Sequence, residues 1–286
     1  MQSENDTVKN CISIDVEGFI ESNMQSFPVH RKYISETREK YEIEKNINFI
    51  LDLLDELNVK ATFFFLGRIG RDIPGTVKEV AGLGHEIGCH SFEHVRVFGL
   101  TQDQFRKSLM HAKKLLEDLS GRKVCGFRAP DFSITESNIW ALDILRETGF
   151  IYDSSIFPTG LHDVYGIKSA NTVIHRLPNG LIEFPLSVIK FFGRAIPFGG
   201  GGYFRLYPAF VTKFCIRKLN EVRQPIMVYL HPYEIGPIVP YVTELSSYRK
   251  FRHYYNCSGC FDKLKKMHRV FRFDTAMSVL KQSGFL

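Results

Sequence analysis

His90 and His94, four residues apart, are the side chains of this sequence whose type and spacing most directly suggest chemistry. Neutral imidazole is the commonest side-chain metal ligand, and one helical turn would aim both rings at one point. The pair follows the apolar run 85–89, which is typical of a strand, and α/β folds place their sites at the C-terminal ends of strands. Because Ser91 replaces the glutamate of the zinc-protease motif His-Glu-x-x-His, that motif is excluded. The pair indicates a metal site only if acidic residues accompany it.

Two carboxylates end the first predicted strand. Residues 8–17 alternate between apolar and polar side chains, so Asp15 and Glu17 point to one side and the apolar residues point toward packing helices. Neighbouring carboxylates repel each other. One interpretation is an exposed surface pair; the other is a bound cation that neutralises the repulsion.

Further polar residues lie at the ends of later predicted strands. Arg128 ends the strand 124–128, Asp153 ends the strand 150–153, and His231 follows the buried strand 226–230. A barrel gathers its strand ends onto one face, so these side chains are expected to share a face with the histidines and the first carboxylates.

The elements that position these residues alternate between strand and helix, which indicates a parallel sheet or a barrel. A long loop, 18–41, separates the first strand from the first helix, and its Phe19, Phe27 and Tyr33 either line a sugar-binding groove or anchor the loop. Further strands are predicted at 60–66 and 85–89, and helices at 42–57, 74–83, 101–119, 135–148 and 208–222.

The second half of the chain is less regular. Residues 173–176 and 181–189 predict a β-hairpin around Asn179-Gly180. The glycine run 199–202 is either a flexible connector or backbone held close to a substrate. Residues 248–269 are expected to be helical in part, and 271–273 form a strand, after which Asp274 would cap a last helix through Lys281.

The bulk properties are those of a soluble globular protein. The chain has 286 residues, 44% hydrophobic and 24% charged, and a net charge of +6. Because the basic residues are scattered, a solvated basic face is favoured over a nucleic-acid surface, although an anionic or lipid-linked substrate stays open. We expect one catalytic domain over 1–286, with a core at about 10–235 and a C-terminal extension at 236–286.

Location is predicted from the polar residues 1–10, which lack the apolar stretch of a secretory signal, and from the lack of a transmembrane-length apolar run. These features predict a cytoplasmic protein whose six cysteines stay reduced. Cys257 and Cys260 form a single C-x-x-C, which is interpreted as two incidental thiols rather than a redox or zinc site.

The order of these motifs resembles that of the polysaccharide deacetylases, the NodB-homology carbohydrate esterases. The matching segments are the acidic strand end 13–17, His-Ser-x-x-His at 90–94, Arg-x-Pro at 128–130, the strand end 153–155 and Leu-His at 230–231. The resemblance covers about residues 10–235. The run 199–205 and the segment 229–234 are similar to the branch associated with bacterial exopolysaccharide and surface-glycan loci.

The resemblance implies a distorted (β/α) barrel of about seven strands and a divalent metal, most simply Zn²⁺, with Co²⁺, Ni²⁺, Mn²⁺ or Fe²⁺ as alternatives. Matched residue by residue, Glu17, His90 and His94 would be the ligands. Asp15 would be the general base and His231 the general acid. Arg128 would orient Asp15, and Asp153 would tune His231. The commonest pattern has two adjacent aspartates, whereas here the second acid is Glu17, one residue further on.

The implied reaction is removal of an N-acetyl group from an amino sugar of a glycan, as part of surface-polysaccharide biosynthesis. An N-acetylated saccharide is the expected partner, with peripheral contact to a lipid-linked substrate open and no nucleic acid involved. The alternatives are a deacetylase of peptidoglycan or another exported polymer, an enzyme acting on a related amide such as an N-formyl group, and a catalytically inactive glycan-binding barrel. A two-histidine, one-carboxylate set is also the ligand set of non-haem iron oxygenases, but their usual double-stranded β-helix does not fit the βα alternation.

Overall fold

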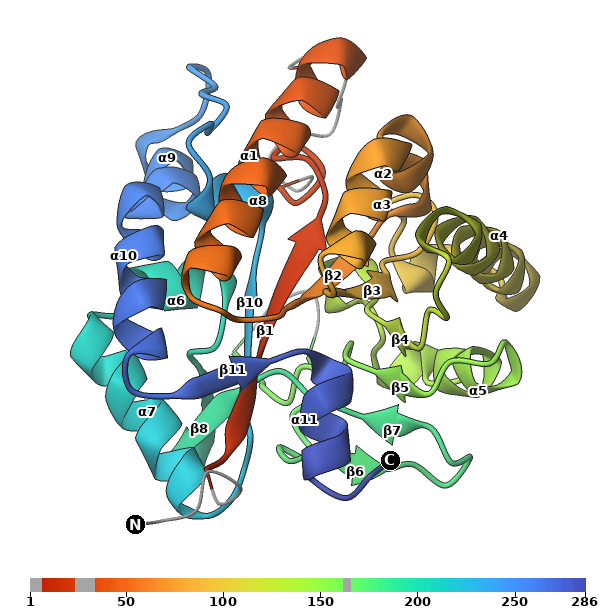
Figure 1. Cartoon of the computed structure of the whole chain (residues 1–286). Coiled ribbons are helices and arrows are strands. Elements are labelled where there is room, and N and C mark those ends of the chain that lie inside the picture. The colour runs from red at the N-terminus through yellow and green to blue at the C-terminus, as the bar shows by residue number, and fades with distance from the viewer. Residues whose placement is uncertain (1–6, 24–33, 162–165) are drawn as a thin grey trace.

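One curled sheet organises the molecule, which is described here by a computed structural model covering residues 7–23, 34–161 and 166–286. The strand order is β10-β1-β2-β3-β4-β5-β7-β6, and β11 pairs with β1 (Figure 1). The strands are β1 (Lys9–Val16), β2 (Thr62–Phe65), β3 (Glu86–Cys89), β4 (Gly126–Phe127), β5 (Tyr152–Asp153), β6 (His175–Arg176), β7 (Ile182–Glu183), β10 (Met227–Leu230) and β11 (Arg272–Asp274).

The run from β10 to β7 contains seven strands, and each neighbouring pair in it is parallel. Within the described residues, β10 and β6 end the order and do not pair, so the sheet is a half-barrel rather than a closed ring. The predicted distorted (β/α) barrel of about seven strands is therefore confirmed. Strand β6 is antiparallel to β7, and it closes the predicted hairpin around Gly180, whose φ is +84°.

Helices cover the outer face of the sheet, as the βα alternation predicts (Figure 1). The apolar residues of β1 explain this packing, because Ile12, Ile14 and Val16 are fully buried in the main hydrophobic cluster. The helices are α1 (Glu36–Glu56), α2 (Gly67–Asp72), α3 (Pro74–Gly82), α4 (Gln102–Ser120), α5 (Ala141–Glu147), α6 (Gly201–Leu206), α7 (Ala209–Glu221), α8 (Pro232–Ile235), α9 (Ser247–Tyr254), α10 (Cys257–His268) and α11 (Ala276–Gln282).

Helix α1 begins six residues before its predicted start. The Ser35 side chain accepts a hydrogen bond from the backbone N–H of Arg38, so a proper N-cap starts the helix in a stretch with little apolar periodicity. Residues 24–33 of the preceding loop, with Phe27 and Tyr33, lie outside the described residues. Phe19 anchors the described part, because its ring is buried against Tyr233 and Tyr254.

Several other boundaries differ from the prediction. The helix expected at 135–148 is split into two parts. The first is a 3-10 turn at Glu136–Asn138, which begins with a capping box at Thr135, and the second is the short α5. Strand β4 is only two residues long. A second hairpin, β8 (Val188–Phe191) with β9 (Arg194–Pro197), replaces the far end of the predicted strand 181–189.

The glycine run 199–202 is not a flexible connector. Gly200 bridges Tyr229 on β10, and a side chain at position 200 would collide with the Tyr229 ring, so glycine is needed for close approach of two backbones. From Gly201 the chain continues as α6.

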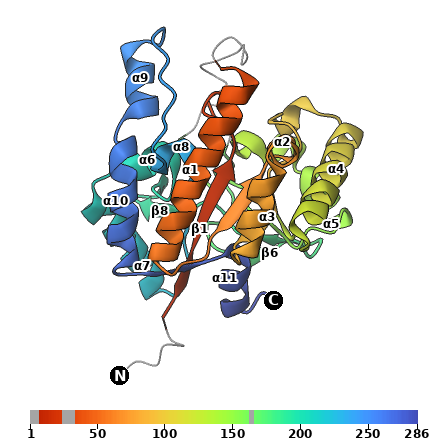
Figure 2. The ribbon, with the colours of Figure 1, turned by 45° about the horizontal axis from the view of Figure 1, so that its top comes forward.

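The last residues return to the first strand. Thr275, rather than the predicted Asp274, caps α11 by accepting from the N–H of Ser278. Asp274 instead forms an ion pair of 2.8 Å with Lys9 at the start of β1. All six cysteines are free, and Cys257 and Cys260 lie buried on α10. In Figure 2, α9 lies at the end of the molecule opposite the N-terminus.

Candidate active site

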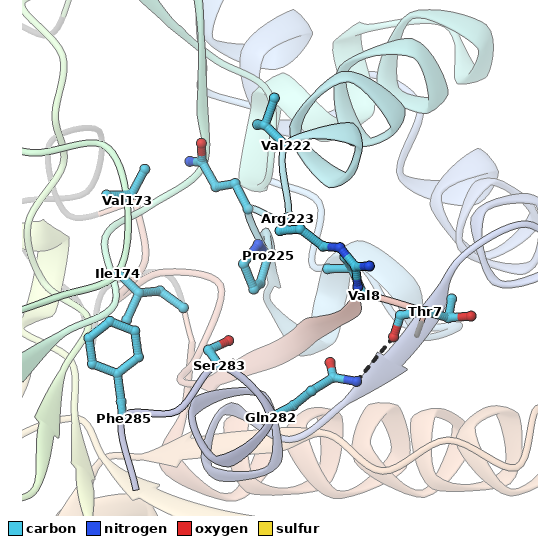
Figure 3. A pocket seen from close by; sticks show the side chains of 11 residues that line it. Thr7, Val8, Val173, Ile174, Val222, Arg223, Pro225, Gln282, Ser283 and Phe285 are labelled. Atoms are coloured by element: carbon cyan, nitrogen blue, oxygen red, sulfur yellow. Dashed lines mark hydrogen bonds between the residues drawn. The ribbon is translucent and has the colours of Figure 1, made fainter. Parts of the chain in front are cut away.

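Two cavities of similar volume lie at different parts of the fold. One, about 500 Å³, is formed by residues from the start of β1, the α7–β10 turn and the C-terminal end of the chain (Figure 3). Arg223 is the one charged residue among its lining, and a hydrogen bond from Gln282 to the carbonyl of Thr7 spans one side. The other, about 450 Å³, contains Asp15, Glu17, His90 and His231. Only the second combines titratable groups that could carry out chemistry.

Strand register explains why these residues meet. Glu17, His90, Arg128 and His231 each come directly after the last residue of a strand, namely β1, β3, β4 and β10. The pairings Val16–Phe65, Phe65–Cys89 and Cys89–Phe127 are in register across β1, β2, β3 and β4, so the residues that follow lie in one row. The predicted shared face at the strand ends is therefore present.

Glu17, His90 and His94 form a compact buried group. Their ligand atoms all lie within 4.8 Å of one another, with Nε2 of His94 at 2.6 Å and Nε2 of His90 at 3.3 Å from Oε2 of Glu17. The two histidines converge without a helical turn, because residues 92–94 form a bend and Ser91 has a φ of +73°. The chain thus brings the predicted ligand set together by a different local route.

The donor atoms fit a metal ion. The Nδ1 of His90 lies 2.8 Å from the carbonyl oxygen of Arg128; a proton on Nδ1 leaves Nε2 free to act as a ligand. Oε2 of Glu17 and Nε2 of His94 are buried, and neither makes a well-aligned hydrogen bond despite their short separation. Both atoms therefore point at a common space rather than at each other, as ligands of one cation would.

Charge pairing within this group is strong. Burial raises the pKa of Glu17, but the charge of His94 and the close approach of the three surrounding histidines outweigh burial and hold that pKa well below its usual range. Burial lowers the pKa of His94, and Glu17 overcomes this and raises it to about 9. A carboxylate facing a protonated imidazole is the charge arrangement that a divalent cation would replace.

Asp15 lines the same pocket and is held by a buried guanidinium. Nη1 of Arg128 is 2.5 Å from Oδ1 of Asp15, and the Arg128 side chain is fully buried against the ring of Phe64. Ser154 accepts from Arg128 through its backbone carbonyl and its hydroxyl. Arg128 thus orients Asp15, the arrangement expected from the resemblance.

His231 contacts the group through Glu17, and its other partner was not predicted from the sequence. Nε2 of His231 is 3.1 Å from Oε1 of Glu17, while Nδ1 is 2.8 Å from Oε2 of Glu234. Oε1 of Glu234 accepts a 2.6 Å hydrogen bond from Nε of Arg205, so a buried chain runs from Arg205 through Glu234 to His231. The signal was present in the sequence as a glutamate three residues after His231, which places both on the first turn of α8.

The hydrogen-bonded series Arg205–Glu234–His231 sets the protonation states of its own members. Burial raises the pKa of Glu234, but Arg205 and His231 outweigh burial and lower it to about 2. Burial lowers the pKa of His231, whereas Tyr233, Glu234 and Glu17 raise it well above its usual value. His231 is therefore set to carry a proton toward the pocket while Glu234 stays ionised.

Asp153 does not take the place expected for it beside His231. Its carboxylate accepts from the backbone N–H and the hydroxyl of Ser155, and that hydroxyl in turn accepts from the N–H of Ala129. Burial raises the pKa of both Asp153 and its neighbour Glu183, so the pair retains a proton. Because β5 lies beside β4 rather than β10, Asp153 supports the Arg128 segment, and Glu234 is the carboxylate that contacts His231.

Comparison with known proteins agrees with this geometry. The family model described as polysaccharide deacetylase matches residues 30–151, which include His90, His94 and Arg128. Residues 30–151 are thus similar to the polysaccharide deacetylase domain. A second model, described as a domain of unknown function (DUF3473), matches residues 154–281. Asp15 and Glu17 precede both matches, and His231 falls in the second, so the pocket combines residues from before, within and after the deacetylase match.

Two curated relatives and one solved structure are similar to this chain. A peptidoglycan-N-acetylglucosamine deacetylase of Bacillus cereus is 36% identical over 148 residues, which are 47% of this chain and 52% of the relative. A peptidoglycan deacetylase of Helicobacter pylori is 30% identical over 40% of this chain and 38% of its own length. The chain thus spans about half or less of these relatives.

The solved structure, from Mycobacterium smegmatis and assigned to the polysaccharide deacetylases, has a TM-score of 0.65 at 20% identity. The match covers 99% of this chain and 92% of the other, which agrees with the fold of the described residues. Among the described residues, no helix has the length and apolarity needed to cross a membrane.

Proposed function

We propose that this chain is a metal-dependent hydrolase that removes the N-acetyl group from an amino sugar of a glycan. One observation carries the proposal: a buried group of three residues that could hold a metal shares one pocket with an aspartate held by an arginine and a histidine held by a glutamate. Amide hydrolysis needs an activated water and a proton for the leaving nitrogen, and these side chains match those needs.

Glu17, His90 and His94 would hold the divalent metal, most simply Zn²⁺. When bound, the metal supplies a water of lowered pKa and polarises the acyl carbonyl. A set of three protein ligands is the number found in hydrolytic zinc sites, which keep a further position open. The hydrogen bond from His90 to the Arg128 carbonyl fixes the ring in the ligating orientation.

Asp15 is the proposed general base. It takes a proton from the water as the water oxygen bonds to the acyl carbon, and Arg128 keeps the Asp15 carboxylate in place during this step. Its partner is fully buried, so the carboxylate cannot swing away without leaving a buried charge unpaired.

His231 is the proposed general acid. As the bond between the acyl carbon and the sugar nitrogen breaks, His231 gives its Nε2 proton to that nitrogen, and the products are acetate and the free amino sugar. Glu234 holds the Nδ1 proton of His231 and stabilises the charged ring before transfer. Asp131 also lines the pocket, where it forms an ion pair of 2.6 Å with Arg96.

The substrate we propose is a saccharide intermediate of surface-polysaccharide biosynthesis. The resemblance of the segments 199–205 and 229–234 to that branch supports it. The Bacillus cereus relative is described as a peptidoglycan-N-acetylglucosamine deacetylase, which favours peptidoglycan as the second candidate. The expected cytoplasmic location stays a prediction, and cell fractionation would test it.

Metal content measured beside acetate release tests the function. Wild type, His90→Ala and Asp15→Asn would be purified and incubated with a panel of N-acetylated saccharides. We expect a bound divalent metal in wild type, its loss in His90→Ala, and retained metal without turnover in Asp15→Asn. If wild type binds no metal and Asp15→Asn changes no activity, the inactive glycan-binding barrel becomes the better account.

A further inference from the structure

Helix α9, in the C-terminal extension, forms one wall of the catalytic pocket. Its Tyr248 and Phe251, together with Tyr255 just after it, line the same cavity as Asp15 and His231. These three rings are 73%, 53% and 44% exposed, a high value for large apolar side chains. The rings of Phe251 and Tyr255 lie 4.9 Å apart, so they form a continuous aromatic surface. Exposed apolar surface gathered in one pocket indicates a binding surface.

A positive charge accompanies these rings. Arg252 also lines the pocket and lies close enough to Tyr203 to oppose the rise that burial causes in the Tyr203 pKa. Among the described residues, no carboxylate forms an ion pair with Arg252.

The acids of the same pocket are already paired. Asp15 is bound to Arg128, Asp131 to Arg96, Glu234 to Arg205, and Glu17 to the histidines. Arg252 has no acid partner among the residues that the structure describes, and it lies on the same helix as the exposed aromatic rings. Its charge is therefore available to a ligand.

Helix α9 is held in place by the hydrogen-bonded series Arg205–Glu234–His231. Nη1 of Arg205 donates to the carbonyl of Tyr255 at 2.6 Å, and Nη2 donates to the carbonyl of Arg252 at 3.2 Å. The Arg205 side chain is only 5% exposed, and its Nε holds Glu234 behind His231. One buried guanidinium thus ties the last turn of α9 to the proposed general acid, so the wall is preorganised relative to the reacting group.

We propose that α9 forms a subsite for a sugar residue that bears an anionic group, next to the N-acetylated residue that reacts. The aromatic rings would stack on the apolar face of the sugar ring, and Arg252 would bind its carboxylate or phosphate. The inference rests on the proposed function for the identity of the neighbouring reaction, whereas binding of the anionic sugar can be measured without it. The substrate class would then be an acidic glycan.

Binding to the full-length chain tests the subsite. The probes are hyaluronan tetrasaccharide, which alternates N-acetylglucosamine with glucuronate, neutral chitotetraose, and N-acetylglucosamine 1-phosphate. Affinities would be measured by calorimetry in an Asp15→Asn background, so that the probes are not consumed. Arg252→Gln is the test variant, and Arg249→Gln is the matched control, because Arg249 is exposed on the same helix and does not line the pocket.

We expect hyaluronan tetrasaccharide to bind more tightly than chitotetraose. Arg252→Gln should lower the affinity for the anionic saccharide about tenfold, which corresponds to the loss of roughly one charge-assisted hydrogen bond. It should leave the affinity for chitotetraose unchanged. Arg249→Gln should leave both unchanged. A comparable Arg252-dependent loss with the sugar phosphate alone would assign the subsite to phosphate, and a loss with the uronate alone would assign it to carboxylate.

Two results would overturn the inference. One is equal affinity of Arg252→Gln and its parent for both anionic probes. The other is Arg252-dependent binding of phosphatidylglycerol vesicles with no such dependence for any saccharide, which would make α9 a membrane contact. Failure of the proposed function is distinguishable: wild type would release no acetate from any probe, while the affinity difference at Arg252 persisted.

Discussion

Replacing Glu234 by glutamine isolates the role of the proposed general acid. Glutamine has nearly the same shape, but it carries no charge to hold the Nδ1 proton of His231. The pKa of Glu234 is lowered from 4.5 to about 2, a net effect of roughly 3 kcal/mol in favour of the ionised carboxylate, in which Arg205 and His231 outweigh the cost of burial. If about half of this belongs to His231, the loss is about tenfold, and the full contribution of a general acid is about 10²–10⁴-fold. We expect kcat for acetamide hydrolysis to fall by about 10- to 100-fold.

Leaving-group dependence provides the assay. The nitrogen of an N-acetylated saccharide must be protonated as it departs, whereas the 4-nitrophenolate of 4-nitrophenyl acetate departs without a proton. Glu234→Gln should therefore lose activity on the saccharide and retain most of it on the aryl ester. Metal content should stay at the wild-type value, because Glu234 is not among the proposed ligands.

Glu183→Gln is the matched control for this substitution. Glu183 is equally buried, lies outside the catalytic pocket, and has a pKa raised well above its usual value by burial and by Asp153. A neutral glutamine should replace it with little effect on either substrate. An equal loss of both activities in Glu234→Gln, with metal and fold intact, would refute the assignment of Glu234 to proton delivery.

Three further predictions concern the rest of the site and its support. Metal binding at pH 7.5 should release a proton from His94, whose pKa is raised to about 9, so affinity should increase with pH up to that value; calorimetry in buffers of different ionisation enthalpy would count the proton. Asp153→Asn should lower activity on saccharide and aryl ester together, about tenfold, because it disturbs the backbone just after the base-orienting Arg128 rather than the acid. Gly200→Ala should reduce the free energy of unfolding by about 1–3 kcal/mol in a denaturant titration, because its new methyl group meets the Tyr229 ring.

The sequence was sufficient to predict the strand ends and the residues on them. Alternation along 8–17 places Asp15 and Glu17 on one side, and that depends only on the geometry of a strand. Parallel topology then brings residues 90, 128 and 231 to the same edge without any knowledge of side-chain packing. These relations were predictable because they follow from local pattern and one topological rule.

Partner choice was not predictable in the same way. Asp153 and Glu234 are both carboxylates close to strand ends, and only the order of strands decides which of them reaches His231. Helix boundaries failed for a related reason: the cap at Ser35 starts α1 within a polar stretch, and apolar periodicity appears only after its first turn. Such choices depend on hydrogen bonds between residues that pattern analysis treats as independent.

The pairing of β1 with both β10 and β11 has a consequence for folding during synthesis. Strand β1 is made first, but its edge partner at Cys11–Ile14 is Met227–Leu230, and its partner at Lys9–Cys11 is Arg272–Asp274. Until those residues emerge from the ribosome, a strand rich in buried apolar side chains has unpaired backbone groups on one edge and on part of the other. Such edges recruit other chains, so this protein would depend on protection of its nascent N-terminal strand for most of its translation.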